Sequence, residues 1–354
     1  LSGSSLGKTY VEACDALFDF YTESLPAVLA FMKKKYPKPP QTPDALYESI
    51  TKARVCDVLR YALPASTYTS IGMTGNARVL EHMISKLLSH PLPEMQDIGG
   101  KLKDEARKII PTLVKYADRN AYMAGMDAAM EKLSVMRGGR KKKGGRLVTL
   151  VSYDRDAEDR VLSSVIYRYS DMPHKEALQL VRSLGRAKNT ALIESLFAGR
   201  GKFDSVPREL ENAYYTFDVL VDYGAFRDIQ RHRMCTQVNQ DVTTAHGYDV
   251  PQELKEAGLD GKFRELMEKA EVAFKKICRK FPKEAQYVVP LAYKKRMLMT
   301  MNLRALHHFI TLRSGREGHI SYRKVAWAMH DEIARVHPEL ARYIRVDRSE
   351  GASR

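Results

Sequence analysis

The feature that most constrains this chain of 354 residues is an internal repeat. A shift of 226 positions places eight residues on identical ones, in order: Pro64 on Pro290, Met73 on Met299, Thr74 on Thr300, Asn76 on Asn302, Arg78 on Arg304, Leu80 on Leu306, His82 on His308 and Ile84 on Ile310. A shift of 227 matches a second block, which runs from Asp104-Glu105 on Asp331-Glu332 to Tyr116 on Tyr343. Core packing does not demand the polar matches, so we predict two copies of one helical unit, over about 53–119 and 285–348.

Hydrophobic periodicity predicts the elements. Helical spacing covers residues 10–35, 44–61, 75–89, 95–116 and 119–136. Strands are expected at 147–152 and 214–222. Further helices are expected over 154–169 with Asp154 as N-cap, twice within 174–198, over 225–232 and from Gly261 onward. The predicted fold class is α+β and predominantly helical: a small β-sheet segment with packed helices precedes a helical half, and a repeated helical half stands at the N-terminus.

A basic tract divides the chain. Residues 137–146 hold six positive charges and no negative one, out of a formal net charge of +15. Such a tract is typical of a solvated linker, with a phosphate-binding arm as the alternative. We therefore expect the C-terminal helical part of a first copy at 1–136 and a second, more complete copy at 147–354. The first copy has no counterpart of the strand-bearing residues 146–250, and the chain begins at Leu1, so we expect roughly a hundred further residues upstream.

Composition and cysteine spacing exclude several classes of protein. No apolar run approaches the ~18 residues that span a bilayer, so a membrane protein is not expected. Cys14, Cys56, Cys235 and Cys278 lie far apart, which argues against a metal site and a disulfide framework and favours a cytoplasmic protein. Because much of the positive charge lies in one tract, a pI near 9.5 does not by itself indicate nucleic-acid binding.

Two groups of polar residues have the chemistry of anion sites. Arg231-His232-Arg233 ends an expected helix, where two guanidiniums beside an imidazole can hold a pyrophosphate; the alternative is a solvated helix end. In a second expected helix, Asn302 and Arg313 share one face, roughly 16 Å apart, a span that suits an extended cofactor with a substrate at its end. The alternative for this helix is an amphipathic core helix with exposed basic residues.

In combination, these elements resemble the flavin-dependent thymidylate synthase family. The strand at 214–222, the short helix ending in Arg-His-Arg and the N-x-R…H-F-I-x-L-R segment follow one another in the family's order, over about 146–348. The resemblance implies that FAD, reduced by NADPH, passes a one-carbon unit from methylenetetrahydrofolate to C5 of dUMP and then supplies a hydride. No enzymic nucleophile is required, and Cys235 is interpreted as a structural thiol. Two copies in one chain imply a pseudo-dimer, and two chains would then equal the family's tetramer.

The resemblance also implies roles for particular residues. The flavin contacts would be Arg231, His232, Arg233, Asn302, Arg304, Glu211 and, in the first copy, Asn76 and Arg78. Arg313 would be the catalytic arginine that reaches the pyrimidine, and Gln237 and Asn239 would lie on the substrate side. The departures are Thr236, Val238, Asn239, Asp241 and Thr243 in the nucleotide loop, His319 and Ser321 in place of Gln and Glu, and Leu87 in place of the arginine of the first copy.

Three functions remain open at this point. The first is an active synthase whose working site is shared between copies. The second is a flavoprotein that keeps FAD but has changed or lost its nucleotide substrate, because a hydroxyl replaces the phosphate-holding guanidinium at Thr243 and Asp241 adds a repulsive charge. The third is a non-enzymatic basic scaffold or RNA binder that uses residues 137–146.

Overall fold

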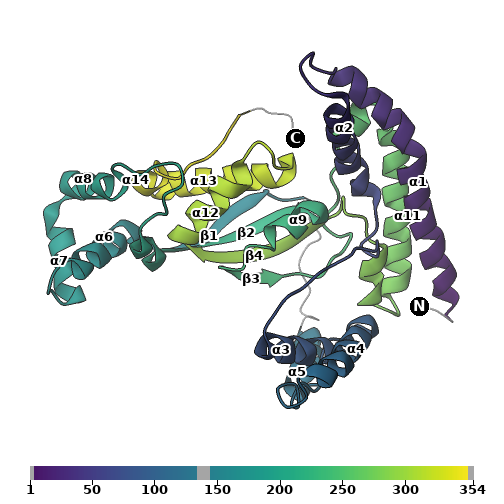
Figure 1. Cartoon of the computed structure of the whole chain (residues 1–354), viewed down its shortest axis with the longest axis horizontal. Coiled ribbons are helices and arrows are strands. Elements are labelled where there is room, and N and C mark those ends of the chain that lie inside the picture. The colour runs from purple at the N-terminus through teal and green to yellow at the C-terminus, as the bar shows by residue number, and fades with distance from the viewer. Residues whose placement is uncertain (1–3, 134–143, 350–354) are drawn as a thin grey trace.

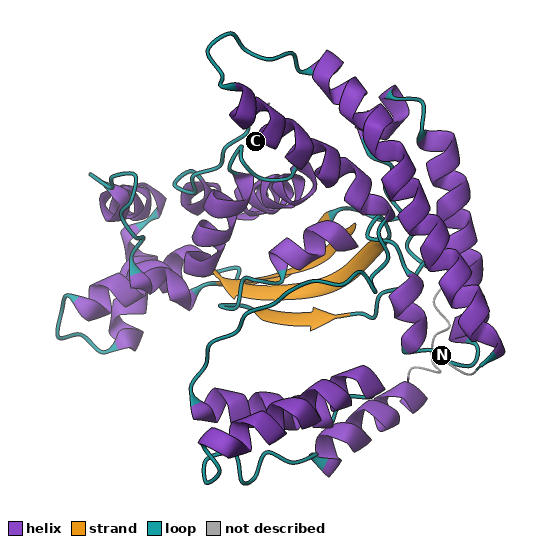
Figure 2. Cartoon of the chain, turned by 45° about the vertical axis from the view of Figure 1, so that its right-hand side comes forward, coloured by secondary structure: helices purple, strands orange, loops and turns teal. Residues whose placement is uncertain are grey.

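A computed structural model describes residues 4–133 and 144–349. The expected fold class is confirmed: the molecule is α+β and predominantly helical, with one small antiparallel sheet (Figure 2). The sheet has the order β1-β2-β4-β3, with bounds Val148–Tyr153, Tyr214–Asp222, Lys294–Asn302 and Thr236–Asn239 respectively. Residues 137–143, which make up most of the expected linker, lie outside the described residues, so the linker remains a prediction.

The strand β2 is central and β4 lies beside it over their whole length. Tyr214 pairs with Asn302 at one end and Asp222 with Lys294 at the other, while β3 pairs with the far edge of β4. Two of these strands correct the sequence prediction, which expected helices from Gly261 onward and no strand at 236–239. The alternation in β4 is real, since Met297, Met299 and Met301 are all buried. Methionine does not favour a strand, however, so it is the partner β2 that decides the conformation of β4.

Three long helices stand side by side at one end of the molecule (Figure 1). These are α1 (Ser5–Lys35), α2 (Asp44–Leu59) and α11 (Asp260–Cys278), which share a core with residues of η1 (Arg60–Ala62) and η4 (Glu284–Val288). A separate bundle of α3 (Ala77–Leu88), α4 (Pro93–Ile109) and α5 (Ala121–Leu133) lies away from the sheet (Figure 1). Its own core is small, with Ile84, Val114 and Ala117 as the buried members.

The main core lies against the sheet. The helices that contribute to it are α6 (Ala157–Arg168), α7 (His174–Leu184), α8 (Arg186–Phe197), α9 (Tyr223–Ile229), α12 (Leu303–Ser314), α13 (Ile320–Val336) and α14 (Pro338–Ala341). The short elements η3 (Arg208–Asn212) and α10 (Gln252–Glu256) connect the rest. Asp154 does not cap α6, because the N-cap is Asp156 and the Asp154 carboxylate accepts a hydrogen bond from the Tyr214 amide instead, at 2.9 Å.

The helices of the two predicted copies correspond residue for residue. The bounds of α3 and α12 differ by 226 at both ends, and those of α4 and α13 by 227. The copies also meet at equivalent positions, since Pro64 forms a β-bridge with Pro290. Around this bridge the Ala65 amide donates to the Val289 carbonyl at 2.9 Å, and the Leu291 amide to the Leu63 carbonyl at 3.0 Å. Within the described ranges, no helix is long and apolar enough to cross a membrane.

Candidate functional site

A cavity of about 920 Å³ opens where the loop after α9 meets α12. Its volume lies in the range of roughly 300–1,000 Å³ that small-molecule sites occupy. Two acidic side chains, Asp204 and Glu211, line it together with eight cationic ones: Arg200, Lys202, Arg208, Arg231, Arg233, Arg304, Arg313 and Arg345. Such a surplus of positive charge on a concave surface attracts anions. The cavity is therefore suited to a ligand that carries several negative charges.

Two of the predicted residues, 81 positions apart, are in direct contact. The Arg313 Nε donates a hydrogen bond to His232 Nε2 at 2.7 Å. The same guanidinium donates through Nη2 to the Asp228 carbonyl at 2.6 Å and lies over the Tyr322 ring, 5.2 Å from its centroid. Arg313 stands in the last turn of α12 and His232 just beyond α9. These two hydrogen bonds and the ring contact therefore hold the guanidinium in one orientation.

His232 is kept neutral by its surroundings. Burial, the Arg313 guanidinium and His308 together lower the pKa of His232 to about 4. Its ring is 4.7 Å from the Phe309 ring, edge to face. Because Nε2 accepts the hydrogen bond from Arg313, the proton of the neutral ring is on Nδ1. At neutral pH the contact is thus a hydrogen bond to an uncharged acceptor, and the positive charge of Arg313 remains available to a ligand.

Arg304 and Glu211 form the second contact between predicted residues. The Arg304 Nη1 donates to Glu211 Oε1 at 2.8 Å, which brings η3 against the first turn of α12. Asn302 lies beside them, but it is the last residue of β4 and the N-cap of α12, where its Oδ1 accepts from the Ala305 amide at 2.8 Å. The prediction that Asn302 and Arg313 share a face of one helix is thus wrong for Asn302, which precedes the helix. Both residues nevertheless line the cavity.

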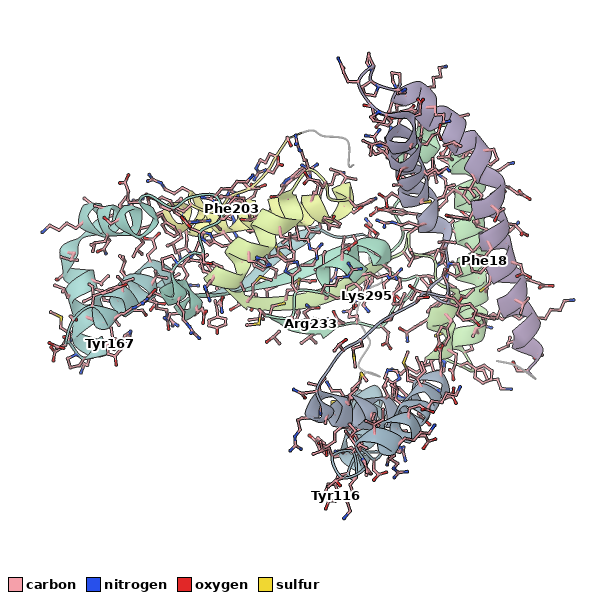
Figure 3. All side chains as sticks on the ribbon, viewed as in Figure 1. Phe18, Tyr116, Tyr167, Phe203, Arg233 and Lys295 are labelled. Carbon is pink, nitrogen blue, oxygen red and sulfur yellow. The ribbon has the colours of Figure 1, made fainter. Side chains whose placement is uncertain are left out.

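The Arg-His-Arg triplet lies in a loop and does not end the helix. The helix α9 stops at Ile229, and Arg231 and Arg233 are exposed, with an ion pair from Arg231 to Asp228 at 3.3 Å. Arg233 stands beside the sheet in Figure 3. Both guanidiniums are therefore free to reorient toward a ligand in the cavity. Cys235 is half-buried, its thiol donates to the His232 carbonyl at 2.9 Å, and burial raises its pKa, which fits a structural thiol.

A family model decides the relationship of this chain to known proteins. The model of the thymidylate synthase complementing protein matches residues 2–112 and 149–339, well over half of the chain. The chain belongs to the thymidylate synthase complementing protein family. Its two contacts, Arg313 with His232 and Arg304 with Glu211, join residues that the family resemblance singled out.

The curated relatives include UPF0159 proteins and flavin-dependent thymidylate synthases. A UPF0159 protein of Chlamydia muridarum is 36% identical over 361 residues, covering 99% of this chain and 68% of its own length. A UPF0159 protein of Chlamydia pneumoniae is 34% identical and covers 96% of this chain and 66% of its own. A flavin-dependent thymidylate synthase of Sulfurisphaera tokodaii is 30% identical over 143 residues, or 38% of this chain and 56% of its own. The chain thus spans about two thirds of the length of the two Chlamydia proteins.

Two solved structures were also matched. One is a UMP/dUMP methylase from Streptomyces cacaoi bound with 5-Br dUMP, at 18% identity, covering 55% of this chain and 93% of the methylase, with a TM-score of 0.45. The other is a flavin-dependent thymidylate synthase from Helicobacter pylori complexed with FAD and dUMP, at 19% identity, covering 56% of this chain and 99% of that structure, with a TM-score of 0.41.

Four of the residues singled out by the family resemblance do not line the cavity. Gln237 stabilises the triplet through the backbone, since its side-chain amide donates a hydrogen bond to the His232 carbonyl at 2.8 Å. Asn239 is exposed at the end of the edge strand β3. Asn76 caps α3, and Arg78 pairs with Glu81 at 2.8 Å, both in the separate bundle that also holds Tyr116 in Figure 3. The structure therefore does not bring the residues of the first copy to this cavity.

Arg345, Arg200 and His307 are among the lining residues that the sequence analysis did not single out. The Arg345 guanidinium donates to the carbonyls of Arg200 at 3.1 Å and Gly201 at 2.7 Å, which fixes the 200–202 segment. The Nε of Arg200 is buried and has no partner among the described residues. His307 is 2% exposed, neither ring nitrogen has a partner within the described ranges, and burial lowers its pKa to about 3. The adjacent pair His307-His308 could have indicated a histidine at the site, but the sequence does not show which of the two imidazoles is buried.

A second cavity, of about 890 Å³, lies between the two predicted copies and is lined by both. Asp222 is 1% exposed there and caps α9, while burial raises its pKa to about 6. Next to it the Tyr61 hydroxyl is 2.6 Å from the Ser321 hydroxyl, which joins the first copy to the start of α13. His319, one of the departures from the family pattern, is the N-cap of α13 and packs against Tyr61. In the part of the chain that the structure describes, no group of acidic, histidine or cysteine side chains is arranged to hold a metal ion.

Proposed function

We propose that this protein is a flavin-dependent thymidylate synthase that holds FAD in the cationic cavity beside Arg313. The observation that supports it most directly is the contact of Arg313 with His232, because it joins the proposed catalytic arginine to the proposed flavin triplet at 2.7 Å. The family membership supports the reaction class.

The lining residues fit a cofactor with a diphosphate. Eight cationic side chains against two acidic ones leave a strong positive surplus, which a pyrophosphate would neutralise. The unpaired Nε of Arg200 is a further donor in the wall, and the neutral His307 ring adds one donor and one acceptor that a polar ligand would satisfy. Of the exposed guanidiniums that line the cavity, Arg231 and Arg233 would hold the phosphates, and Asn302 and Arg304 would be further contacts.

The chain's own residues would then orient and protect the reacting groups. Arg313, held by His232 and the Asp228 carbonyl, would present a fixed guanidinium to the carbonyl edge of the pyrimidine. His232 would stay neutral and keep the full charge of Arg313 directed at the anionic substrate. Hydride transfer is the chemistry that FAD would supply when bound. No nucleophilic side chain of the protein is needed.

The remaining reactants follow from the same proposal. NADPH would reduce the flavin, methylenetetrahydrofolate would donate the one-carbon unit, and dUMP would be the acceptor that becomes dTMP. The pairing of the two copies at Pro64 and Pro290 supports a pseudo-dimer within the chain, and we propose a homodimer of chains as the working assembly.

A changed nucleotide substrate is the second candidate function. The observation that favours it is the loop after the triplet, where Thr243 replaces the phosphate-holding arginine and Asp241 forms an ion pair with Lys283 at 3.2 Å. Lys283 is the N-cap residue of η4, so the ion pair holds the loop against this element. The loop itself contains no arginine that could bind an anion. Under this alternative, the chain binds FAD and acts on a different acceptor.

One experiment separates the two candidates. Purified full-length protein is reconstituted with FAD, NADPH and methylenetetrahydrofolate, and tritium release from C5-labelled dUMP is measured while dUMP is titrated against the flavin spectrum. The synthase proposal expects saturable tritium release that Arg313→Ala abolishes. A flavin-loaded protein that shows neither a spectral change nor tritium release with dUMP would leave the second candidate in place.

A further inference from the structure

The segment before α3 is the counterpart of a buried strand. Residues 68–76 align with β4 by the shift of 226, and in both copies an asparagine at the end caps the next helix with nearly the same backbone angles. Yet no strand of the described residues pairs with 68–76, which have no regular secondary structure. The two copies therefore share the helix start and differ in what precedes it.

The apolar side chains of this segment are exposed, whereas the alternating methionines of β4 are buried. Ile71 is 84% exposed and Met73 is 52% exposed, whereas their equivalents Met297 and Met299 are 1% and 0% exposed. Apolar side chains that alternate along a segment gain stability when a partner strand buries them, so their exposure here indicates a missing partner. At the third buried position of β4, Met301, the first copy has Gly75, so its strand would be weaker at that end.

In the helix α3, which follows this segment, apolar side chains are also less buried than their equivalents in the second copy. Leu80 and Met83 of α3 are only partly buried, while their equivalents Leu306 and Phe309 of α12 are fully buried against the sheet. The apolar face of the first copy, made of the apolar side chains of 68–76 and of Leu80 and Met83, is thus less buried than its counterpart. In the second copy the corresponding face is closed by β2, whose Phe217 and Val219 stand opposite Met299 and Met297.

We propose that residues 68–76 become a β-strand by pairing with a β2-like strand from polypeptide that is not among these 354 residues. The occupant is a strand with apolar side chains at alternate positions, because the face it covers has the β4 pattern. The chain's own β2 cannot supply it, since β1 and β4 already occupy both of its edges. In the Chlamydia muridarum relative about a third of the length lies outside the match with this chain, which leaves room for such a strand within one polypeptide.

Hydrogen exchange compares the two copies within one protein. In the 354-residue chain, amides of 68–76 exchange at the rate of unstructured peptide while those of 294–302 are protected. In the full-length Chlamydia muridarum relative, the stretches aligned with 68–76 and with 294–302 are both protected, by more than about 100-fold. Fast exchange of the stretch aligned with 68–76 in that longer protein overturns the proposal. So does protection in the 354-residue chain, which would mean that a second copy covers the face.

Substitutions supply a matched control. In the 354-residue chain, Ile71→Asp leaves the melting temperature unchanged because the side chain is already exposed, while the equivalent Met297→Asp unfolds the sheet. An aspartate at the position aligned with Ile71 in the longer relative restores fast exchange there, and one at the position aligned with the exposed Tyr122 does not. Equal effects of Ile71→Asp and Met297→Asp in the 354-residue chain would contradict the proposal. Neither measurement depends on flavin binding or on synthase activity.

Discussion

Among single residues, Arg313 has the central role in the proposed reaction, and its contacts determine how the guanidinium is oriented. Three contacts fix it, to His232, to the Asp228 carbonyl and to the Tyr322 ring. A lysine keeps the charge but has one donor centre, so it cannot make the Nε and Nη2 hydrogen bonds together. Charge and geometry can therefore be tested separately at this position.

We predict that Arg313→Lys lowers the rate of tritium release from dUMP by at least about 100-fold while the flavin content changes little. The guanidinium acts on the pyrimidine in this account, and the phosphates are held by other residues. The control is Arg316→Lys, because the Arg316 side chain is 72% exposed just beyond α12 and does not line the cavity. Equal losses in both variants, or full activity of Arg313→Lys, would be inconsistent with the assigned role.

Asp222 gives a prediction for stability against pH. Burial raises its pKa from 3.8 to about 6, so the folded protein holds a proton that the unfolded chain releases. The carboxyl therefore favours the folded state at low pH, and this contribution is lost as the pH rises from about 4 to 6. Asp222→Asn keeps a cap for α9 and removes the titration. We expect the variant to be more stable than the parent above pH 6, by up to about 3 kcal/mol, and to gain nothing at pH 4.

Denaturant unfolding at a series of pH values measures this difference. The control is Asp249→Asn, which changes an exposed carboxylate of the same cavity. A stability gain for Asp222→Asn that is the same at pH 4 and pH 7 would show that packing, and not titration, is responsible.

At the scale of elements, the two helix starts offer a natural pair. Asn76 and Asn302 accept hydrogen bonds from Val79 and Ala305 in the same way, at 3.0 and 2.8 Å. We predict that Asn76→Ala and Asn302→Ala each cost about 1 kcal/mol, because each removes a helix cap. Only Asn302 lines the cationic cavity, so only Asn302→Ala should weaken FAD binding, measured by flavin fluorescence titration. Weaker FAD binding in Asn76→Ala would contradict the separation of the copies.

Helices were predicted well from the sequence, and strands only where β-branched or aromatic residues dominate. The alternation of β-branched and aromatic residues in 214–222 indicated β2, while the methionine-rich β4 has helix-compatible composition and becomes a strand through its partners. The lesson at this scale is that a strand defined by its neighbours leaves little signal in its own residues.

At the scale of the whole molecule, the candidate site is assembled from segments more than a hundred residues apart. The triplet and the Asn302–Arg313 stretch were predicted because their spacing is a local pattern. Arg200 and Arg345 were not, because the hydrogen bonds between them join 200–202 to 345 and depend on the final fold. The location of the positive charge was also predicted only in part, since eight cationic side chains outside the basic tract gather around one cavity.

This charge distribution predicts how salt affects binding. FAD carries a diphosphate and riboflavin carries none, so raising the ionic strength about tenfold should weaken FAD binding severalfold and leave riboflavin binding nearly unchanged. Fluorescence titrations of both ligands at low and high salt measure the difference. Deleting Arg140–Lys143 from the basic tract should not alter either curve. If the deletion removed the salt dependence, the tract and not the cavity would hold the phosphates.

If the cavity beside the Arg-His-Arg loop is a flavin site, the purified protein carries bound flavin, which its absorbance measures. The protein is purified in the presence of FAD, and the bound flavin is quantified in the parent, in Arg231→Ala and in Arg227→Ala, whose exposed arginine stands on α9 outside the cavity. We predict a yellow parent, an unchanged Arg227→Ala and a loss of most of the flavin band in Arg231→Ala. A colourless parent, or a flavin band that both variants retain in full, would contradict the account.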